Sequence, residues 1–60
     1  MYSNLDAERI QRGYTEEYVA KKLGITRQEY RLRSESGAFL ESDALALVGM
    51  YGKSFEYLFF

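Results

Sequence analysis

The chain has 60 residues, a formal net charge of −1 and no cysteine, histidine, proline or tryptophan. This length allows one domain, residues 1–60, which buries only about 60% of the surface of its unfolded chain and depends on close helix packing or on a partner. Because cysteine and histidine are missing, thiolate nucleophiles, imidazole bases and metal sites with nitrogen or sulfur ligands are excluded, and we expect no enzymatic activity, no metal site and no cofactor.

The first predicted helix lies at the N-terminus. No alternation of apolar and polar residues extends beyond a few positions, so helices are expected throughout the chain. Ser3 or Asn4 is the expected N-cap of the first helix, which we expect to run to about Arg12. Gly13 then ends this helix.

A second helix is predicted after Thr15, because threonine accepts hydrogen bonds well at an N-cap. Its apolar stripe consists of Val19, Ala20 and Leu23, which share one helix face. Gly24 ends this helix, since glycine adopts positive φ angles without steric cost.

A third helix is predicted directly after a short turn. Thr26 is its expected N-cap, and Gly37 marks its end. Tyr30 is the expected core contact of this helix. The segment Ser36–Glu41 is expected to form the most mobile loop of the chain.

A fourth helix is predicted after this loop. Ser42 is its expected N-cap, and its inward stripe is expected at Leu45, Val48 and Tyr51. With one more helix at the C-terminus, the sequence predicts a compact all-α bundle of about five short helices.

The chain ends in a short, strongly apolar segment. Ser54 is the expected N-cap of the last helix, with Phe55 and Leu58 pointing inward. A domain of this size cannot bury all the aromatic residues near its end, so we expect part of the segment to dock with a second copy or another protein. The expected docking surface consists of Tyr51, Phe55, Phe59 and Phe60.

Charge is distributed unevenly along the chain. Residues 1–34 carry seven basic and five acidic side chains, whereas residues 35–60 carry one basic and four acidic. The longest uninterrupted apolar stretch, Ala44–Val48, is far shorter than the roughly 20 residues of a membrane span, and the N-terminus lacks a signal-peptide pattern. We therefore expect a cytoplasmic protein with no membrane partner, whose basic N-terminal part faces any anionic ligand.

The segment from Thr15 to Tyr30 has the layout of a helix–turn–helix, with a capped helix, a short turn and a second capped helix rich in arginine and glutamine. Ala20 supplies a small residue where the two helices cross, and Ile25 supplies an apolar residue after the turn glycine. A helix held in this way can enter a major groove roughly 12 Å wide with its N-terminal side chains against the base edges.

The chain resembles the lambda-repressor-like helix–turn–helix family of the Cro/C1 type (XRE family) over the run AERIQRGYTEEYVAKKLGITRQEY, residues 7–30. From Arg9 onward this run matches the family pattern R-x-x-x-G-x-T-x-x-x-(apolar)-A-x-x-(apolar)-G-(apolar)-Ser/Thr. The ending SFEYLF is similar to the serine-capped fifth helix of the family. The resemblance covers nearly the whole chain and implies the family's fold and its binding of double-stranded DNA.

The resemblance also implies which residues contact DNA. Thr15 would cap the second helix beside a phosphate, while other side chains would read bases or hold the backbone. Glu16 stands where family members carry a glutamine that contacts phosphate, and its carboxylate would be repelled there. The expected DNA-binding set is Thr15, Glu16, Lys21, Arg27, Gln28, Arg31 and Arg33.

Arg9 and Glu35 correspond to a buried ion pair of the family, between the first helix and the end of the third. Loss of one partner of such a pair is expected to cost about 3–5 kcal/mol, because the other charge is left buried alone. A single module of this size buries too little DNA surface for high affinity, so we also expect a homodimer on two half-sites.

Two short patterns are explained by structure alone. The run GMYGKS, residues 49–54, is similar to the tail of a phosphate-binding loop, but the spacing would place the first glycine at Leu47 and no strand precedes it. Glu16 and Glu17 point about 100° apart on a helix, and acids at a helix start interact favourably with its dipole. Neither pattern predicts nucleotide binding or acid–base catalysis.

Two functions remain open from the sequence. The first is sequence-specific binding of double-stranded DNA by a small phage or bacterial repressor, with a recognition helix at about residues 26–34 in the major groove. The second is a helix–turn–helix protein that binds another regulator, as antirepressors and co-repressors do. Glu16, the acidic C-terminal half and the apolar end favour the second function. Neither function requires a small-molecule substrate.

Overall fold

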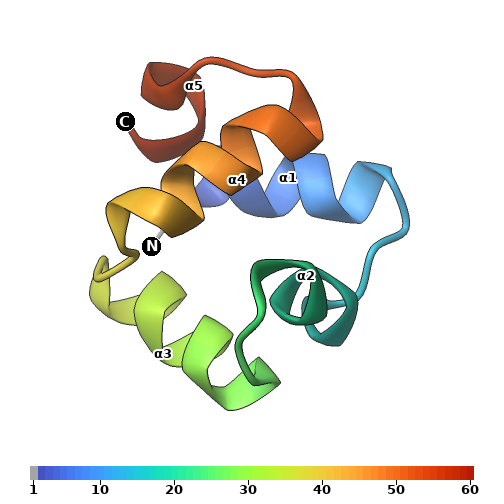
Figure 1. Ribbon diagram of the computed structural model, residues 1–60. Helices are drawn as coiled ribbons and strands as arrows, with labels where there is room; N and C mark the ends of the chain where they lie inside the picture. The colour runs from blue at the N-terminus through green and yellow to red at the C-terminus, as the bar shows by residue number, and fades with distance from the viewer. Residues whose placement is uncertain (1) are drawn as a thin grey trace.

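The computed structural model describes residues 2–60, and this range contains five α-helices (Figure 1). Their bounds are α1 Ser3–Gln11, α2 Glu16–Leu23, α3 Arg27–Ser36, α4 Glu41–Tyr51 and α5 Phe55–Phe59. Residues 2–60 contain no strand, so the predicted all-α bundle of about five short helices is confirmed. In Figure 1, α2 and α3 form the lower part of the molecule, and α1, α4 and α5 form the upper part.

Side chains cap the helices α2, α3 and α5 at the predicted residues. The Thr15 hydroxyl accepts a hydrogen bond from the Tyr18 backbone N–H at 3.0 Å. Thr26 and Glu29 form a reciprocal capping box at the start of α3. The Ser54 hydroxyl accepts from the Tyr57 backbone N–H at 3.1 Å. These bonds satisfy donors that would otherwise lack a partner in the first turn of each helix.

The predicted caps of the other two helices are wrong. Helix α1 begins at Ser3 itself, with Tyr2 at the N-cap and no side-chain cap. Helix α4 begins at Glu41, so Ser42 lies inside the helix and Leu40 occupies the N-cap. The carboxylate of Asp43 accepts from the Leu40 backbone N–H at 3.1 Å and takes over the capping function expected of a serine.

The segment predicted as a loop over residues 36–41 is shorter than expected. Helix α3 includes Ser36 and α4 starts at Glu41, so only residues 37–40 connect them. Phe39 anchors this connection, since its ring lies 5.6 Å from that of Tyr30 and 6.0 Å from that of Phe59. These edge-to-face aromatic contacts fix the short connection against the core.

Seven buried residues from all five helices form the core: Leu5, Val19, Ala20, Tyr30, Leu47, Tyr51 and Leu58. Each fully buried aliphatic side chain contributes about 1.5–3 kcal/mol. The inward positions predicted for Val19, Ala20 and Tyr30 are therefore confirmed, as is that of Leu58.

The predicted inward stripe of α4 is only partly correct. Tyr51 is buried and Val48 is half-buried, but Leu45 is 65% exposed. Leu47 and Ala44 occupy the inward positions instead. Phe55 is also exposed, in contrast to its predicted inward orientation, because α5 buries Leu58 rather than its first residue.

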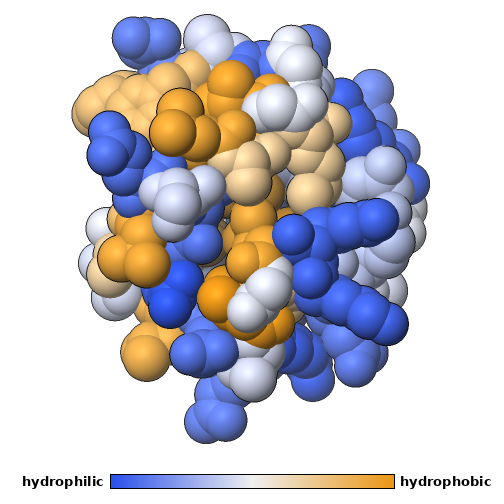
Figure 2. Space-filling model, in the orientation of Figure 1, coloured by the Kyte–Doolittle hydropathy of each residue, from blue (hydrophilic) through white to orange (hydrophobic). Residues whose placement is uncertain are grey.

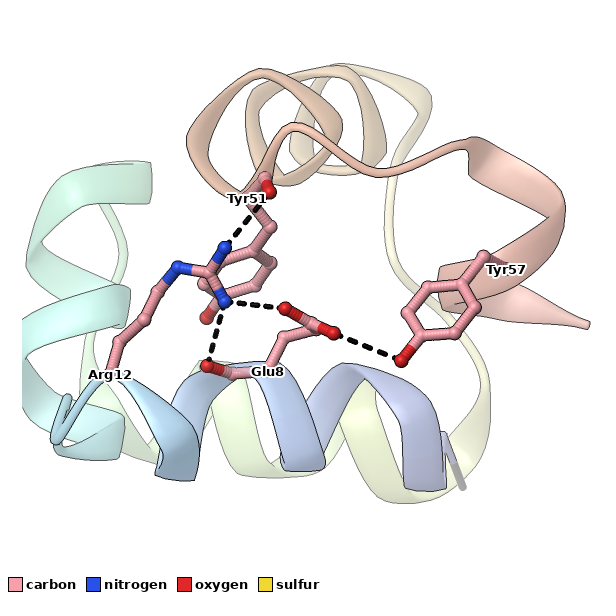
Figure 3. Close-up of polar contacts among 4 residues, drawn as sticks. All are labelled: Glu8, Arg12, Tyr51 and Tyr57. Carbon is pink, nitrogen blue, oxygen red and sulfur yellow. Dashed lines mark hydrogen bonds and ion pairs between the residues drawn. The ribbon is translucent and has the colours of Figure 1, made fainter.

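A polar network joins α1 to the C-terminal part of the chain (Figure 3). Glu8 is only 5% exposed, and its carboxylate accepts hydrogen bonds from the Arg12 guanidinium and from the Tyr57 hydroxyl, the latter at 2.9 Å. Arg12 also donates to the Tyr51 carbonyl at 3.0 Å. The bonds from Arg12 and Tyr57 lower the pKa of the Glu8 carboxyl, while the bond to Glu8 raises the pKa of Tyr57.

A second polar contact joins α1 to α5. The Asn4 side-chain amide donates to the Tyr57 carbonyl at 2.9 Å, across 53 positions of the chain. Together with the bond between Glu8 and Tyr57, it fastens α5 against α1 at two points.

Candidate nucleic-acid interface

Helices α2 and α3 form a helix–turn–helix with a three-residue connection, Gly24 to Thr26. Gly24 adopts φ 76° at the C-terminal end of α2, which turns the chain sharply. The Ile25 backbone N–H donates to the Ala20 carbonyl at 3.0 Å and closes the turn. Because Thr26 then caps α3, local interactions alone fix where the third helix starts.

Helix α3 is anchored from its inner side. Tyr30 is fully buried in the core, and desolvation raises the pKa of its hydroxyl to about 12. At the start of α3, hydrogen bonds from the Thr26 backbone N–H and hydroxyl hold the pKa of the Glu29 carboxyl below its usual value. The position of the helix is thus fixed from its first turn and from its middle.

The outer side of α3 carries three of the predicted DNA-binding residues. Arg27, Gln28 and Arg31 are exposed and line one open depression of the surface. The side chains of Arg27 and Arg31 are 59% and 51% exposed. The chain end lies elsewhere, since α5 packs on α1 and α4. The structure therefore brings these three side chains together on an uncovered helix face.

Glu16 lies against this face rather than apart from it. Its carboxylate oxygen Oε1 is 3.9 Å from Nε of Arg27 and 3.6 Å from Nε of Arg31. The sequence predicted Glu16 beside a phosphate position but did not indicate that it would pair with the arginines of α3. A spacing of 11 and 15 residues between the partners gave no local signal for these contacts.

A hollow lies at the N-terminal end of α2. It is lined by Arg9, Thr15, Glu16, Glu17 and Arg27. The first backbone N–H groups of α2 and two arginines therefore border the same space, together with two acidic side chains. Lys21 lies further along α2, is exposed and has no ion-pair partner among residues 2–60.

Arg33 does not belong to the exposed face, contrary to prediction. Its guanidinium forms an ion pair with Asp43 at 2.7 Å, and its side chain is 22% exposed. Arg33 follows Tyr30 by three positions, so it lies toward the inner side of α3 and reaches α4. The pair holds the C-terminal part of α3 against the start of α4.

The predicted ion pair between Arg9 and Glu35 is not formed in the described structure. Arg9 instead donates through Nη1 to the Tyr14 carbonyl at 2.9 Å. Glu35 lies on the exposed side of α3, where it is 3.8 Å from Arg31, one helical turn earlier. The register of α3 leaves Glu35 exposed to solvent, and Arg33 provides the partly buried ion pair at this end of the helix.

The predicted docking surface near the C-terminus is only partly available. Tyr51 is 3% exposed and belongs to the core, so its assignment to a surface is wrong. Phe59 is half-buried, with its ring 5.1 Å from that of Tyr2. Phe55 and Phe60 remain exposed, and Phe60 is 91% exposed.

An apolar groove that was not predicted lies between α4 and α5. It is lined by Phe39, Leu40, Glu41, Ala44, Leu45, Val48 and Phe55. Figure 2 shows apolar side chains gathered over α4 and α5 and bordered by hydrophilic ones. The sequence signal for this groove lies in α4, which carries apolar residues on two faces. A helix that packs against the core on one side needs them on one face only.

Two further types of site, a membrane span and a metal site, were sought among residues 2–60. No helix within residues 2–60 is long and apolar enough to cross a membrane. In the same range, no three His, Cys, Asp or Glu side chains are grouped so that they could hold a metal ion.

Comparisons with models of protein families, with curated proteins and with solved structures find no match for this chain.

Proposed function

We propose that this protein is a small transcriptional regulator of the repressor type, which binds double-stranded DNA with α3 in the major groove. The observation that carries the proposal is the uncovered face of α3, where Arg27, Gln28 and Arg31 stand together on a helix anchored by Tyr30. In this proposal the protein acts in the cytoplasm by binding alone, without catalysis or a cofactor.

The proposed base contacts come from the outer face of α3. An arginine can donate two parallel hydrogen bonds to O6 and N7 of guanine, and a glutamine can pair in a similar way with adenine. Each such contact discriminates against a wrong base by about 1–3 kcal/mol. Arg27, Gln28 and Arg31 are the residues to which we assign this selectivity.

The proposed phosphate contacts come from the start of α2. The hollow there is bordered by Arg9, Thr15 and Arg27, which with the backbone N–H groups of the first helical turn attract anions, and by Glu16 and Glu17, whose carboxylates oppose this attraction. Lys21, exposed on the same helix, adds a further positive charge. Such contacts fix the protein on the duplex without reading its sequence.

We propose that a second copy of the chain occupies the apolar groove of α4 and α5. One small module buries too little DNA for high affinity, and two-fold dimers of such modules read half-sites about 34 Å apart. The domain measures 24 × 23 × 18 Å, so two copies in contact can span this distance. Exposed Leu45, at the groove, gives each copy an apolar contact.

Sedimentation of the wild-type chain and of two variants tests the dimer. Leu45→Glu introduces a charge into the groove and is expected to yield a monomer at concentrations where the wild-type chain is dimeric. Ala46→Glu introduces the same charge at an exposed position of α4 outside the groove and is expected to leave the dimer intact. A wild-type chain that stays monomeric at high micromolar concentration would exclude this assembly.

Electrophoretic titration with a mixed-sequence duplex tests DNA binding itself. Arg9 and Lys21 of two copies would neutralise about four phosphates, so the affinity is expected to fall about a hundredfold when salt rises from about 50 to about 200 mM. The double variant Arg27→Ala/Arg31→Ala is expected to lose binding. Lys53→Ala removes one positive charge near α5, away from α3, and is expected to keep most of the affinity.

A second candidate function is a modulator that binds another regulatory protein. The apolar groove favours it because it offers a protein partner an apolar surface. The pairing of Glu16 with the arginines of α3 also favours it, because it offsets part of the positive charge that would attract a polyanion. A modulator would show little duplex binding at either salt concentration. Its groove variant Leu45→Glu would lose the partner protein, whereas Arg27→Ala/Arg31→Ala would retain it.

A further inference from the structure

The geometry points to Glu16 as a positioning residue that directs the outer nitrogens of Arg27 and Arg31 toward base edges and opposes their capture by phosphates. This inference rests on the proposed DNA-binding function and extends it, since it assigns sequence selectivity partly to an acidic residue of α2. The evidence is the atoms through which the three side chains meet.

Glu16 contacts both arginines through the same side of each guanidinium. Its Oε1 atom lies 3.9 Å from Nε of Arg27 and 3.6 Å from Nε of Arg31. These separations are those of ion pairs and are longer than hydrogen bonds. Because the two arginines are four positions apart on α3, one carboxylate at the first position of α2 lies within ion-pair distance of side chains from two successive turns.

Contact through Nε determines which edge of each guanidinium is free. The group is planar and carries its donors in a fixed fork, so a partner at Nε leaves the edge formed by Nη1 and Nη2 for other acceptors. Arg27 meets no acceptor other than Glu16 among residues 2–60. Arg31 also has Nη2 at 3.8 Å from exposed Glu35, so Arg27 is the less engaged of the two.

The free edge suits a guanine better than a phosphate in this setting. Guanine presents two uncharged acceptors, O6 and N7, that match two parallel N–H groups. A phosphate carries a full negative charge and is repelled by the Glu16 carboxylate between the arginines. Glu16 therefore reduces attraction to the backbone, which is independent of sequence, more than attraction to base edges.

The neighbouring acid supplies a matched control. Glu17 occupies the next position of α2, is exposed and forms no ion pair among residues 2–60. Glu17→Gln removes the same charge from the same helical turn as Glu16→Gln. A general effect of net charge would be equal in the two variants, whereas a positioning effect would appear only at Glu16.

The experiment compares a preferred duplex with a scrambled duplex of equal length. The preferred duplex is selected from a random pool with the wild-type chain, and both affinities are measured at one salt concentration. For Glu16→Gln we expect tighter binding to the scrambled duplex and a fall of about tenfold in the ratio of the two affinities. For Glu17→Gln we expect a ratio within about twofold of the wild type, since Glu17 lines the hollow of the proposed phosphate contacts and a charge there acts on both duplexes alike.

A third variant separates position from charge. Glu16→Asp keeps the charge but shortens the side chain, and it is expected to lower the ratio without tightening binding to the scrambled duplex. It also serves if Glu16→Gln fails to fold, which a thermal melt would reveal. An unchanged ratio in both Glu16 variants would overturn this inference and leave DNA binding intact. A wild-type chain that binds no duplex would overturn the proposed function and this inference together.

Discussion

The helix–turn–helix and the C-terminal helices of this protein are held together by different kinds of interaction. In α2 and α3, the boundaries depend on contacts between residues three to five positions apart, such as the Thr15 cap and the turn bond from Ile25 to Ala20. The starts of α4 and α5 are also capped locally, by Asp43 and Ser54, but the attachment of α5 to α1 depends on a partner far away along the chain, Glu8 for Tyr57. The first region is therefore specified locally, whereas the placement of α5 depends on the complete fold.

The largest difference in the free energy of unfolding is expected between alanine variants of two leucines of α4. Leu47 is fully buried whereas Leu45 is 65% exposed, so removal of the Leu47 side chain leaves a cavity. We expect Leu47→Ala to lower the free energy of unfolding by about 3 kcal/mol and Leu45→Ala by less than about 0.5 kcal/mol, as chemical denaturation would measure. Equal losses would mean that the inward face of α4 is misassigned.

A somewhat smaller loss of stability is expected when the contact between α3 and α4 is removed. Asp43→Ala removes both the partner of Arg33 and the acceptor of the Leu40 backbone N–H. We expect a loss of about 2 kcal/mol, below the value for a fully buried pair because Arg33 remains partly exposed and can be hydrated. Ser42→Ala, one position earlier in the same helix, is the control in denaturation experiments, and a similar loss there would contradict the capping role of Asp43.

A local contact of the helix–turn–helix should contribute less. Thr26→Ala removes the side-chain acceptor at the start of α3 and is expected to cost about 1 kcal/mol in a thermal melt. Thr26→Ser keeps the hydroxyl and is expected to melt close to the wild type. If serine were as harmful as alanine, the hydroxyl would not be the stabilising group.

The smallest expected effect is the loss, at acidic pH, of the stabilisation that Glu8 provides between α1 and α5. Because the folded state lowers the pKa of Glu8 below its usual 4.5, ionised Glu8 stabilises the fold above this pH and the stabilisation is lost as pH falls through the lowered pKa. We expect the stability difference between wild type and Glu8→Gln to shrink as pH falls below about 4.5. Denaturation curves at several pH values measure it, and a difference independent of pH would contradict the assignment.

Much of the helix–turn–helix could be predicted because its signals are close together in sequence. Threonine at an N-cap and glycine after a helix each act on residues within one turn, and the structure has Thr15, Thr26 and Gly24 in these roles. Ser42 was misassigned because a serine and an aspartate stand side by side, and Asp43 caps from inside the helix. A leucine at the N-cap carries no such signal.

For the candidate site, the sequence predicts which side chains of α3 are exposed but not which residues of other helices they contact. Arg27, Gln28 and Arg31 follow a turn that presents α3 outward, and they are exposed as expected. Arg33 could have been assigned inward from its distance of three positions to Tyr30, but the identity of its partner Asp43 depends on how α3 and α4 pack. The same holds for Glu16, whose contact with α3 arises only when the two helices cross.

The attachment of α5 to α1 through Asn4 and Glu8 has a consequence for biosynthesis. Both contacts need Tyr57, so a nascent chain still lacking its last helix leaves Glu8 with only Arg12 as a partner and the core without Leu58. Residues 55–59 therefore have to leave the ribosome before the fold can close.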